Sequence, residues 1–195
     1  WFVFVLEDSY FAVIQTNTNH HPYVAPEKFK KNYGFDENTN KFFSTFQYSD
    51  KVLGDFLDNY VKTENGKNSL IIITADQGNG KKLVNTSRNK KISILNQYQI
   101  PLLILYPINY KIVRQEINTL GSQVDIMPTI MDIMNMEYNF PMFGKSLIRE
   151  FKYRYAKGSI EGGWLLYDER FISMRHKKSP KDRYGNPLML NKTDI

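Results

Sequence analysis

The fold is decided by the stretch LIIITADQG, residues 70–78. It begins with an apolar run that ends at Ala75, and a run that is apolar on both faces is what a sheet covered on both sides requires. Asp76, Gln77 and Gly78 follow directly, so a carboxylate and an amide carbonyl emerge where this strand is predicted to end. Open α/β sheets bind ligands outside the carboxyl ends of their strands. The stretch therefore predicts both an α/β fold and the position of a site.

Three neighbouring segments extend this pattern. Residues 11–16 are typical of a short strand, and residues 102–106 of a further buried strand enclosed by prolines. From residue 36 to residue 62, apolar side chains recur at the three-and-four spacing of a helix with one buried face. Asn65-Gly66 is expected to end that helix. The order strand, helix, strand predicts a crossover connection and parallel pairing.

The second half of the chain predicts one more helix and a change of character. Residues 122–136 read as a helix in which Asp125 can cap backbone donors and Pro128 falls in the first turn. Short aromatic segments follow and predict an antiparallel appendage. We therefore expect residues 1–150 to form one structural portion and residues 151–195 to form the appendage and tail.

Composition narrows the class of protein. The chain has 195 residues, 42% of them hydrophobic, enough to bury a core as one domain or as part of a larger one. Its longest apolar stretches fall far short of the roughly 20 residues that a membrane-spanning helix needs. No basic leader or small-residue cleavage site marks the start as a signal peptide. Because the chain opens inside an apolar run, we expect that further sequence precedes it.

Charge and cysteine content exclude some chemistries. The chain has no cysteine, which excludes disulfides, thiolate metal sites and cysteine nucleophiles. Its net charge of +6 comes from lysines scattered along the sequence, a pattern typical of solvated faces. We therefore expect no nucleic-acid partner.

The residues after the central strand suit a metal ion. Asp76 and Gln77 both present oxygen, which a hard cation such as Mg²⁺, Ca²⁺ or Mn²⁺ accepts more readily than zinc does. Gly78 lets the backbone turn sharply. The alternative is a simple strand-to-loop turn, because Asp and Gly are common turn residues.

A second turn, Asn19-His20-His21-Pro22, follows the strand predicted at residues 11–16. Adjacent histidines point in different directions, so at most one of the two imidazoles is expected to reach the same edge of the sheet and donate to an anionic oxygen. The alternative is a solvent-exposed turn. His176 lies in a basic cluster and is interpreted as a surface residue.

The region after the central strand predicts a loop, and known catalytic motifs are missing from the sequence. Residues 79–99 are polar and lysine-rich without a clear period, which predicts a long loop over the strand ends. The run GNGKK, residues 78–82, lacks the glycine spacing and the Ser or Thr of a nucleotide phosphate loop. The sequence contains no Gly-x-Ser-x-Gly elbow and no paired-histidine zinc motif.

Six short motifs follow one another along most of the chain. They are residues 11–16 with Asn19-His20-His21-Pro22-Tyr23, then YSDKVLG at 48–54, ITADQG at 73–78, IPLLI at 100–104, SQVDIMPT at 122–129 and FGKSL at 143–147. Together they resemble the sulfatase family, and within it the lipoteichoic-acid-synthase-like branch of the alkaline phosphatase superfamily. The order strengthens the resemblance, because chance matches do not keep order.

The resemblance implies a fold and an activity. The fold is α/β, with an alkaline-phosphatase-like, mostly parallel sheet flanked by helices and a small antiparallel appendage at the carboxyl terminus. The activity is that of a metal-dependent hydrolase or transferase acting on sulfate or phosphate esters. In the family's pattern Asp76 and Gln77 match ligands of a divalent metal (Mg, Mn or Ca), and His20 matches a contact to the substrate's anionic group.

The chain departs from that pattern twice. The lipoteichoic-acid-synthase branch normally has Asp-His-Gly, whereas this chain has Gln77, whose amide oxygen shifts the preference toward harder ions. The nucleophile and the upstream acidic ligands of the family lie before the matched segment, and residues 1–10 do not replace them. One carboxylate and one amide cannot supply the roughly six oxygens that a hard cation takes. We therefore expect the carboxyl-terminal portion of a larger catalytic domain, inactive in isolation.

Two alternatives stay open. A phosphoethanolamine transferase or a cofactor-independent phosphoglycerate mutase would share the strand-end Asp and the Asp-x-x-Pro-Thr helix, although the Asn-His-His-Pro turn favours the first interpretation. A non-catalytic module whose basic loop, Lys81 to Lys91, binds anionic glycans is the other. The resemblance also implies a location in the cell envelope, with possible membrane association through a preceding segment.

Overall fold

The computed structural model describes residues 2–6, 9–78, 98–160, 163–167, 171–174 and 181–182, and it describes side chains within 9–78 and 98–156. The chain divides into two units. The first consists of Trp1–Ile73 and Leu103–Ile112, and the second of Thr74–Leu102 and Val113–Ile195. The predicted domain boundary at residue 150 stays a prediction.

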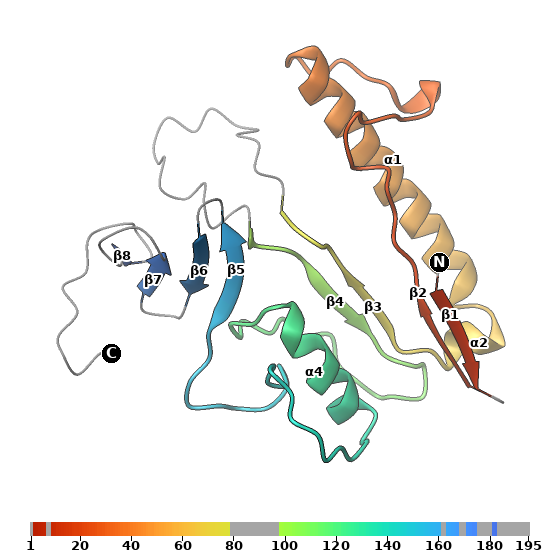
Figure 1. Ribbon diagram of the computed structural model, residues 1–195. Helices are drawn as coiled ribbons and strands as arrows, with labels where there is room; N and C mark the ends of the chain where they lie inside the picture. The colour runs from red at the N-terminus through yellow and green to blue at the C-terminus, as the bar shows by residue number, and fades with distance from the viewer. Residues whose placement is uncertain are drawn as a thin grey trace. The chain divides into compact units, whose positions relative to one another are not determined.

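The first unit opens with a β-hairpin (Figure 1). Strand β1 (Phe2–Leu6) pairs antiparallel with β2 (Ser9–Val13), in a register that places Phe2 opposite Val13 and Leu6 opposite Ser9. The strand expected at residues 11–16 therefore begins and ends earlier than predicted. Because the apolar run at residues 2–6 pairs with it, the local partner sets its register.

The long helix is confirmed almost to the residue. Helix α1 (Glu37–Tyr60) follows a short 3₁₀ helix, η1 (Glu27–Phe29). Asp36 caps it, accepting hydrogen bonds from Thr39 N at 3.0 Å and Thr39 Oγ1 at 2.5 Å. These bonds, the hydroxyl's first, hold the pKa of the Asp36 carboxyl below its usual value. The cap explains why the helix begins here, since it satisfies a donor that the first turn leaves unpaired.

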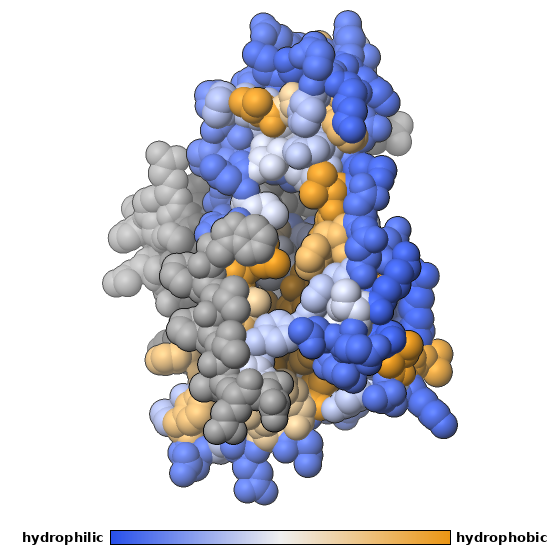
Figure 2. All heavy atoms as spheres, turned by 90° about the vertical axis from the view of Figure 1, so that its right-hand side faces the viewer, coloured by the Kyte–Doolittle hydropathy of each residue, from blue (hydrophilic) through white to orange (hydrophobic). Residues whose placement is uncertain are grey.

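The predicted apolar face of α1 is buried only at one end. Phe42 is 7% exposed, but Phe46 is 56% exposed and Phe56 is 43% exposed. Figure 2 shows hydrophobic residues in orange at the surface among hydrophilic ones in blue. The expectation of one buried face along the whole helix is therefore wrong for the described structure, because spacing indicates which residues share a face and not what covers it.

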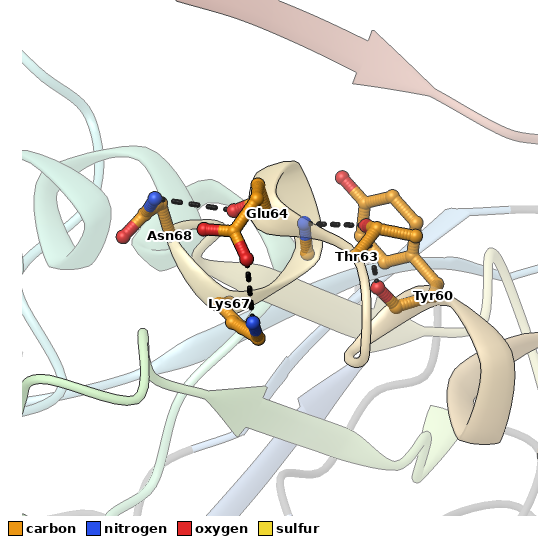
Figure 3. Close-up of polar contacts among 6 residues, drawn as sticks. Tyr60, Thr63, Glu64, Lys67 and Asn68 are labelled. Atoms are coloured by element: carbon orange, nitrogen blue, oxygen red, sulfur yellow. Dashed lines mark hydrogen bonds and ion pairs between the residues drawn. The ribbon is translucent and has the colours of Figure 1, made fainter.

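The end of α1 also differs from expectation. The helix ends at Tyr60, and Asn65-Gly66 lies inside the next helix, α2 (Glu64–Lys67). Thr63 joins the two, since its hydroxyl donates to Tyr60 O at 2.7 Å and accepts from Gly66 N at 2.9 Å (Figure 3). A Cβ at Gly66 would lie 1.8 Å from Tyr60 O, so only glycine fits this close approach.

Strands β3 (Ile71–Thr74) and β4 (Leu102–Leu105) pair with each other, which confirms both predicted strands. Their burial is less complete than predicted. Residues 71–73 are half-buried, and Leu102 and Leu103 are exposed. Complete burial on both faces is therefore wrong for the described structure, and the parallel direction of this sheet stays a prediction.

The second unit contains the other predicted helix, in a shorter form. A 3₁₀ turn, η2 (Gln123–Asp125), leads into α4 (Ile126–Ile133), which ends before the predicted residue 136. Pro128, in the first turn of α4, is buried together with Thr129, Met131 and Ile133. This helix thus supplies much of the described core of its unit.

The carboxyl-terminal region forms a small antiparallel sheet, as predicted (Figure 1). Its strands, in sheet order, are β5 (Ala156–Ile160), β6 (Gly163–Tyr167), β7 (Phe171–Met174) and β8 (Lys181–Asp182). None of the helices in the described part of the chain combines the length and the apolar character that crossing a membrane would need.

Candidate functional site

The predicted oxygen pair lies directly after β3, where the strand ends. Asp76 and Gln77 are both exposed to solvent. Gln77 N donates to Asp76 Oδ1 at 2.8 Å, so the carboxylate folds back on the turn that follows it. Such a bond is common for Asp in turns. It occupies one carboxylate oxygen and leaves the other, Oδ2, with no hydrogen bond among the described residues.

A third residue holds this turn, and the sequence analysis did not assign it. Gln123 Nε2 donates to Ala75 O at 2.9 Å and to Asp76 O at 3.0 Å. Gln123 is the first residue of η2 and lies in the SQVDIMPT motif. The motif was thus a signal in the sequence, but spacing alone could not tell that its glutamine reaches a turn 47 residues earlier.

Gln123 lies two residues before a buried carboxylate, that of Asp125. Asp125 is 6% exposed, and its oxygens accept from Ser122 N at 2.8 Å and from Lys145 N at 2.6 Å. The predicted capping role of Asp125 is therefore confirmed, because it satisfies the donor of Ser122 at the start of η2. Its second bond goes beyond capping, since it ties the helix start to a segment 20 residues later.

The FGKSL segment completes this support. Leu147 N donates to Thr129 Oγ1 at 2.9 Å, one turn along α4 from the bond between Lys145 and Asp125. A Cβ at Gly144 would lie 1.9 Å from Val124 O, so the segment approaches the start of α4 as closely as glycine allows. The carbonyls of residues 145, 146 and 149 accept from the guanidinium of Arg154. The segment is thus held on both its donor and its acceptor sides.

His20 lies in a turn of the first unit and is exposed. Its Nδ1 lies 2.8 Å from His21 O, a carbonyl that can only accept, so Nδ1 carries the proton and donates. The other nitrogen, Nε2, has no hydrogen bond among the described residues. Ser49, on α1, donates to Asn19 Oδ1 at 2.9 Å and ties the turn to the helix. This tautomer leaves Nε2 available to an external partner.

Of the predicted site residues, the structure brings Asp76 and Gln77 together with Gln123 in the second unit. His20 belongs to the first unit, so its approach to Asp76 stays a prediction. The basic loop from Lys81 to Lys91 and the side chain of His176 lie outside the described residues.

The donor set fits a hard divalent cation in chemistry but not in number. Asp76 offers a carboxylate oxygen and Gln77 an amide oxygen, and both side chains are solvent-exposed. Across the residues that the structure describes, no three His, Cys, Asp or Glu side chains gather into a group that could hold a metal ion. Two donors can therefore contribute to a metal shell of about six oxygens without completing it.

Comparison with known families gives one match that covers most of the chain. The family model described as Sulfatase matches residues 5–136. This range contains β2, α1, β3, β4 and α4, and with them Asp76, Gln77 and Gln123.

Two curated relatives are 2,3-bisphosphoglycerate-independent phosphoglycerate mutases. The enzyme from Antithamnion sp. is 30% identical over 98 residues, which cover 50% of this chain and 19% of the relative. The enzyme from Clostridium kluyveri is 30% identical over 99 residues, covering 51% of this chain and 18% of the relative. The chain thus spans about a fifth of the length of these relatives.

A solved structure is similar in fold. It is a protein in the alkaline phosphatase superfamily from Vibrio parahaemolyticus, with a TM-score of 0.68 and 20% sequence identity. The match covers 91% of this chain and 43% of that protein. The likeness shows the α/β fold of that superfamily and, at this identity, nothing about activity.

Proposed function

This chain belongs to the sulfatase family, whose members act on sulfate or phosphate esters, and we propose that the protein uses a divalent metal ion to cleave or transfer such an ester. Asp76 and Gln77 are the proposed metal ligands from this chain, and His20 is the proposed contact to the anionic group. The chain covers only part of its relatives, so no nucleophile is assigned to it.

The observation that carries this proposal is the turn after β3. A carboxylate residue and an amide residue follow each other directly after a strand, and a side chain from another segment holds the backbone next to them. Ligands of open α/β sheets bind at such strand ends. The residue that fixes this backbone lies 47 positions away in the sequence.

Each residue has a defined task in this proposal. Asp76 brings negative charge and Gln77 a neutral oxygen to the cation. When bound, the divalent ion supplies positive charge against the charge that develops on the transferred group. His20 donates from Nδ1 to His21 O, which fixes the ring and leaves Nε2 to face the substrate.

Phosphoryl transfer of the mutase type is a second candidate. It is favoured by the 30% identity to the two phosphoglycerate mutases, which act on a phosphate ester by name. The lipoteichoic-acid-synthase-like branch, the cell-envelope location, the membrane association and the glycan-binding alternative stay predictions from the sequence.

The test uses the full-length protein with an aryl sulfate, an aryl phosphate and a phosphoglycerol lipid as substrates. We expect one ester class to be turned over, the activity to be lost with a chelator, and Mn²⁺ or Mg²⁺ to restore it. Asp76→Asn should lower kcat/KM by at least about 100-fold, because a charged ligand is lost. Asp58→Asn, at an exposed aspartate of α1, is the matched control. Turnover that a chelator and Asp76→Asn both leave unchanged would contradict the proposal.

A further inference from the structure

We propose that Gln123 is a positioning residue, which fixes the backbone at residues 75–76 and thereby the turn that carries the proposed ligands Asp76 and Gln77. This inference rests on the proposed function, because it takes those two residues as metal ligands. It assigns to Gln123 no contact with the metal or the substrate.

One nitrogen of Gln123 makes two hydrogen bonds to the turn. An amide nitrogen carries two hydrogens, and Gln123 Nε2 uses them on two consecutive carbonyls, Ala75 O at 2.9 Å and Asp76 O at 3.0 Å. Consecutive carbonyls of an extended strand point to opposite sides, so their meeting at one donor requires the chain to have left the strand geometry. Gln123 therefore stabilises the turn that directs Asp76 and Gln77.

The backbone around Gln123 is held in place by hydrogen bonds. Gln123 begins η2, and Asp125 two residues later is buried and bonded to Ser122 N and Lys145 N. The glutamine is thus flanked by a residue whose backbone is tied down and by a carboxylate that cannot move without losing two donors. A side chain acting on the turn from such a base transmits a fixed position rather than a flexible contact.

The exposure of Gln123 to solvent distinguishes a structural role from a positioning role. Gln123 is itself exposed, as are Asp76 and Gln77. Its amide therefore buries little surface, and hydrogen bonds between exposed groups add little to stability. A purely structural role would give a small effect on unfolding and none on ligand affinity. A positioning role predicts a similarly small effect on unfolding together with weaker metal binding, since residues behind metal ligands change metal affinity by about 10- to 100-fold.

The experiment measures Mn²⁺ binding to the full-length protein by isothermal titration. Gln123→Met keeps the length of the side chain and removes both donors. We expect the Kd for Mn²⁺ to rise by at least about 10-fold, with the midpoint of thermal unfolding close to that of the unchanged protein. Saturating Mn²⁺ should recover most of the lost activity, because the ligands themselves remain. Gln115→Met, at an exposed glutamine of the same unit, should leave the Kd unchanged.

Asp76→Asn separates this inference from the proposed function. If Mn²⁺ binds, Asp76→Asn weakens binding and Gln123→Met does not, the positioning role is wrong while the proposed function stands. If Asp76→Asn also leaves the Kd unchanged, the metal assignment itself fails. If Gln123→Met lowers the unfolding midpoint strongly, the Kd for Mn²⁺ is measured for Gln123→Asn instead. This side chain keeps the amide but is one methylene shorter, so the amide cannot reach both carbonyls. A wild-type Kd for Gln123→Asn would then overturn the positioning role, and a weakened Kd in a stably folded variant would support it.

Discussion

The two turns that carry the candidate site are supported in different ways. The turn at Asp76 is held through its backbone by Gln123, which stands next to the buried carboxylate of Asp125. The turn at His20 is closed by its own backbone bonds and by an edge contact of Tyr23 with Phe42. The side-chain hydrogen bond that ties it to α1, from Ser49 to Asn19, lies at the surface. A support that is anchored in a buried group is costly to disturb, whereas a support on the surface is not, because solvent replaces its lost hydrogen bond.

The largest effect on stability is expected at Asp125, the buried residue beside the support of the Asp76 turn. Asp125→Ala removes a buried acceptor and leaves two backbone donors, Ser122 N and Lys145 N, without partners. It should lower the free energy of unfolding by about 3 kcal/mol or more, measured by urea denaturation of the full-length protein. Asp58→Ala, at an exposed aspartate, should change it by less than about 0.5 kcal/mol. Equal effects of the two substitutions on the free energy of unfolding would contradict the claim that Asp125 is a costly group to disturb.

A pair of glycines tests how closely the FGKSL segment lies against α4. Gly144→Ala places a Cβ 1.9 Å from Val124 O, a backbone atom that cannot swing away. We expect destabilisation by about 2 kcal/mol from the forced shift. Gly54→Ala is the matched substitution inside α1, where a Cβ meets nothing within 4 Å, and should stabilise by up to about 1 kcal/mol. The opposite signs can be read from one set of thermal unfolding curves.

The smallest effect on stability is expected at the His20 turn. Ser49→Ala removes a hydrogen bond between exposed side chains and should cost about 0.5 kcal/mol or less. If His20 contacts the substrate, the loosened turn should instead raise KM for an anionic ester a few-fold while kcat changes little. Ser49→Thr keeps the hydroxyl and should restore KM. A KM that follows the unfolding midpoint rather than the hydroxyl would show a role in folding alone.

Local features of the fold were predictable from the sequence. The approximate extent of α1 followed from its apolar spacing, and strands β3 and β4 followed from their apolar runs. The antiparallel strands near the carboxyl terminus followed from short aromatic segments. These features depend on residues close in the sequence, so their patterns carry the information directly.

Burial was predicted less well. The apolar spacing of α1 suggested a continuous buried face, but Phe46 and Phe56 are exposed. The apolar runs of β3 and β4 suggested full coverage, but Leu102 and Leu103 are exposed in the described structure. A pattern identifies residues that belong on one face, and only the packing of other segments decides whether that face is covered.

By itself, the sequence determined that a carboxylate and an amide oxygen follow a strand, because neighbouring residues stay neighbours in any fold. Only the tertiary structure decided that Gln123 holds the turn bearing them and that Asp125 joins the start of α4 to the FGKSL segment. These bonds link residues 47 and 20 positions apart. No local spacing encodes them, since they form only after helices, strands and loops have packed.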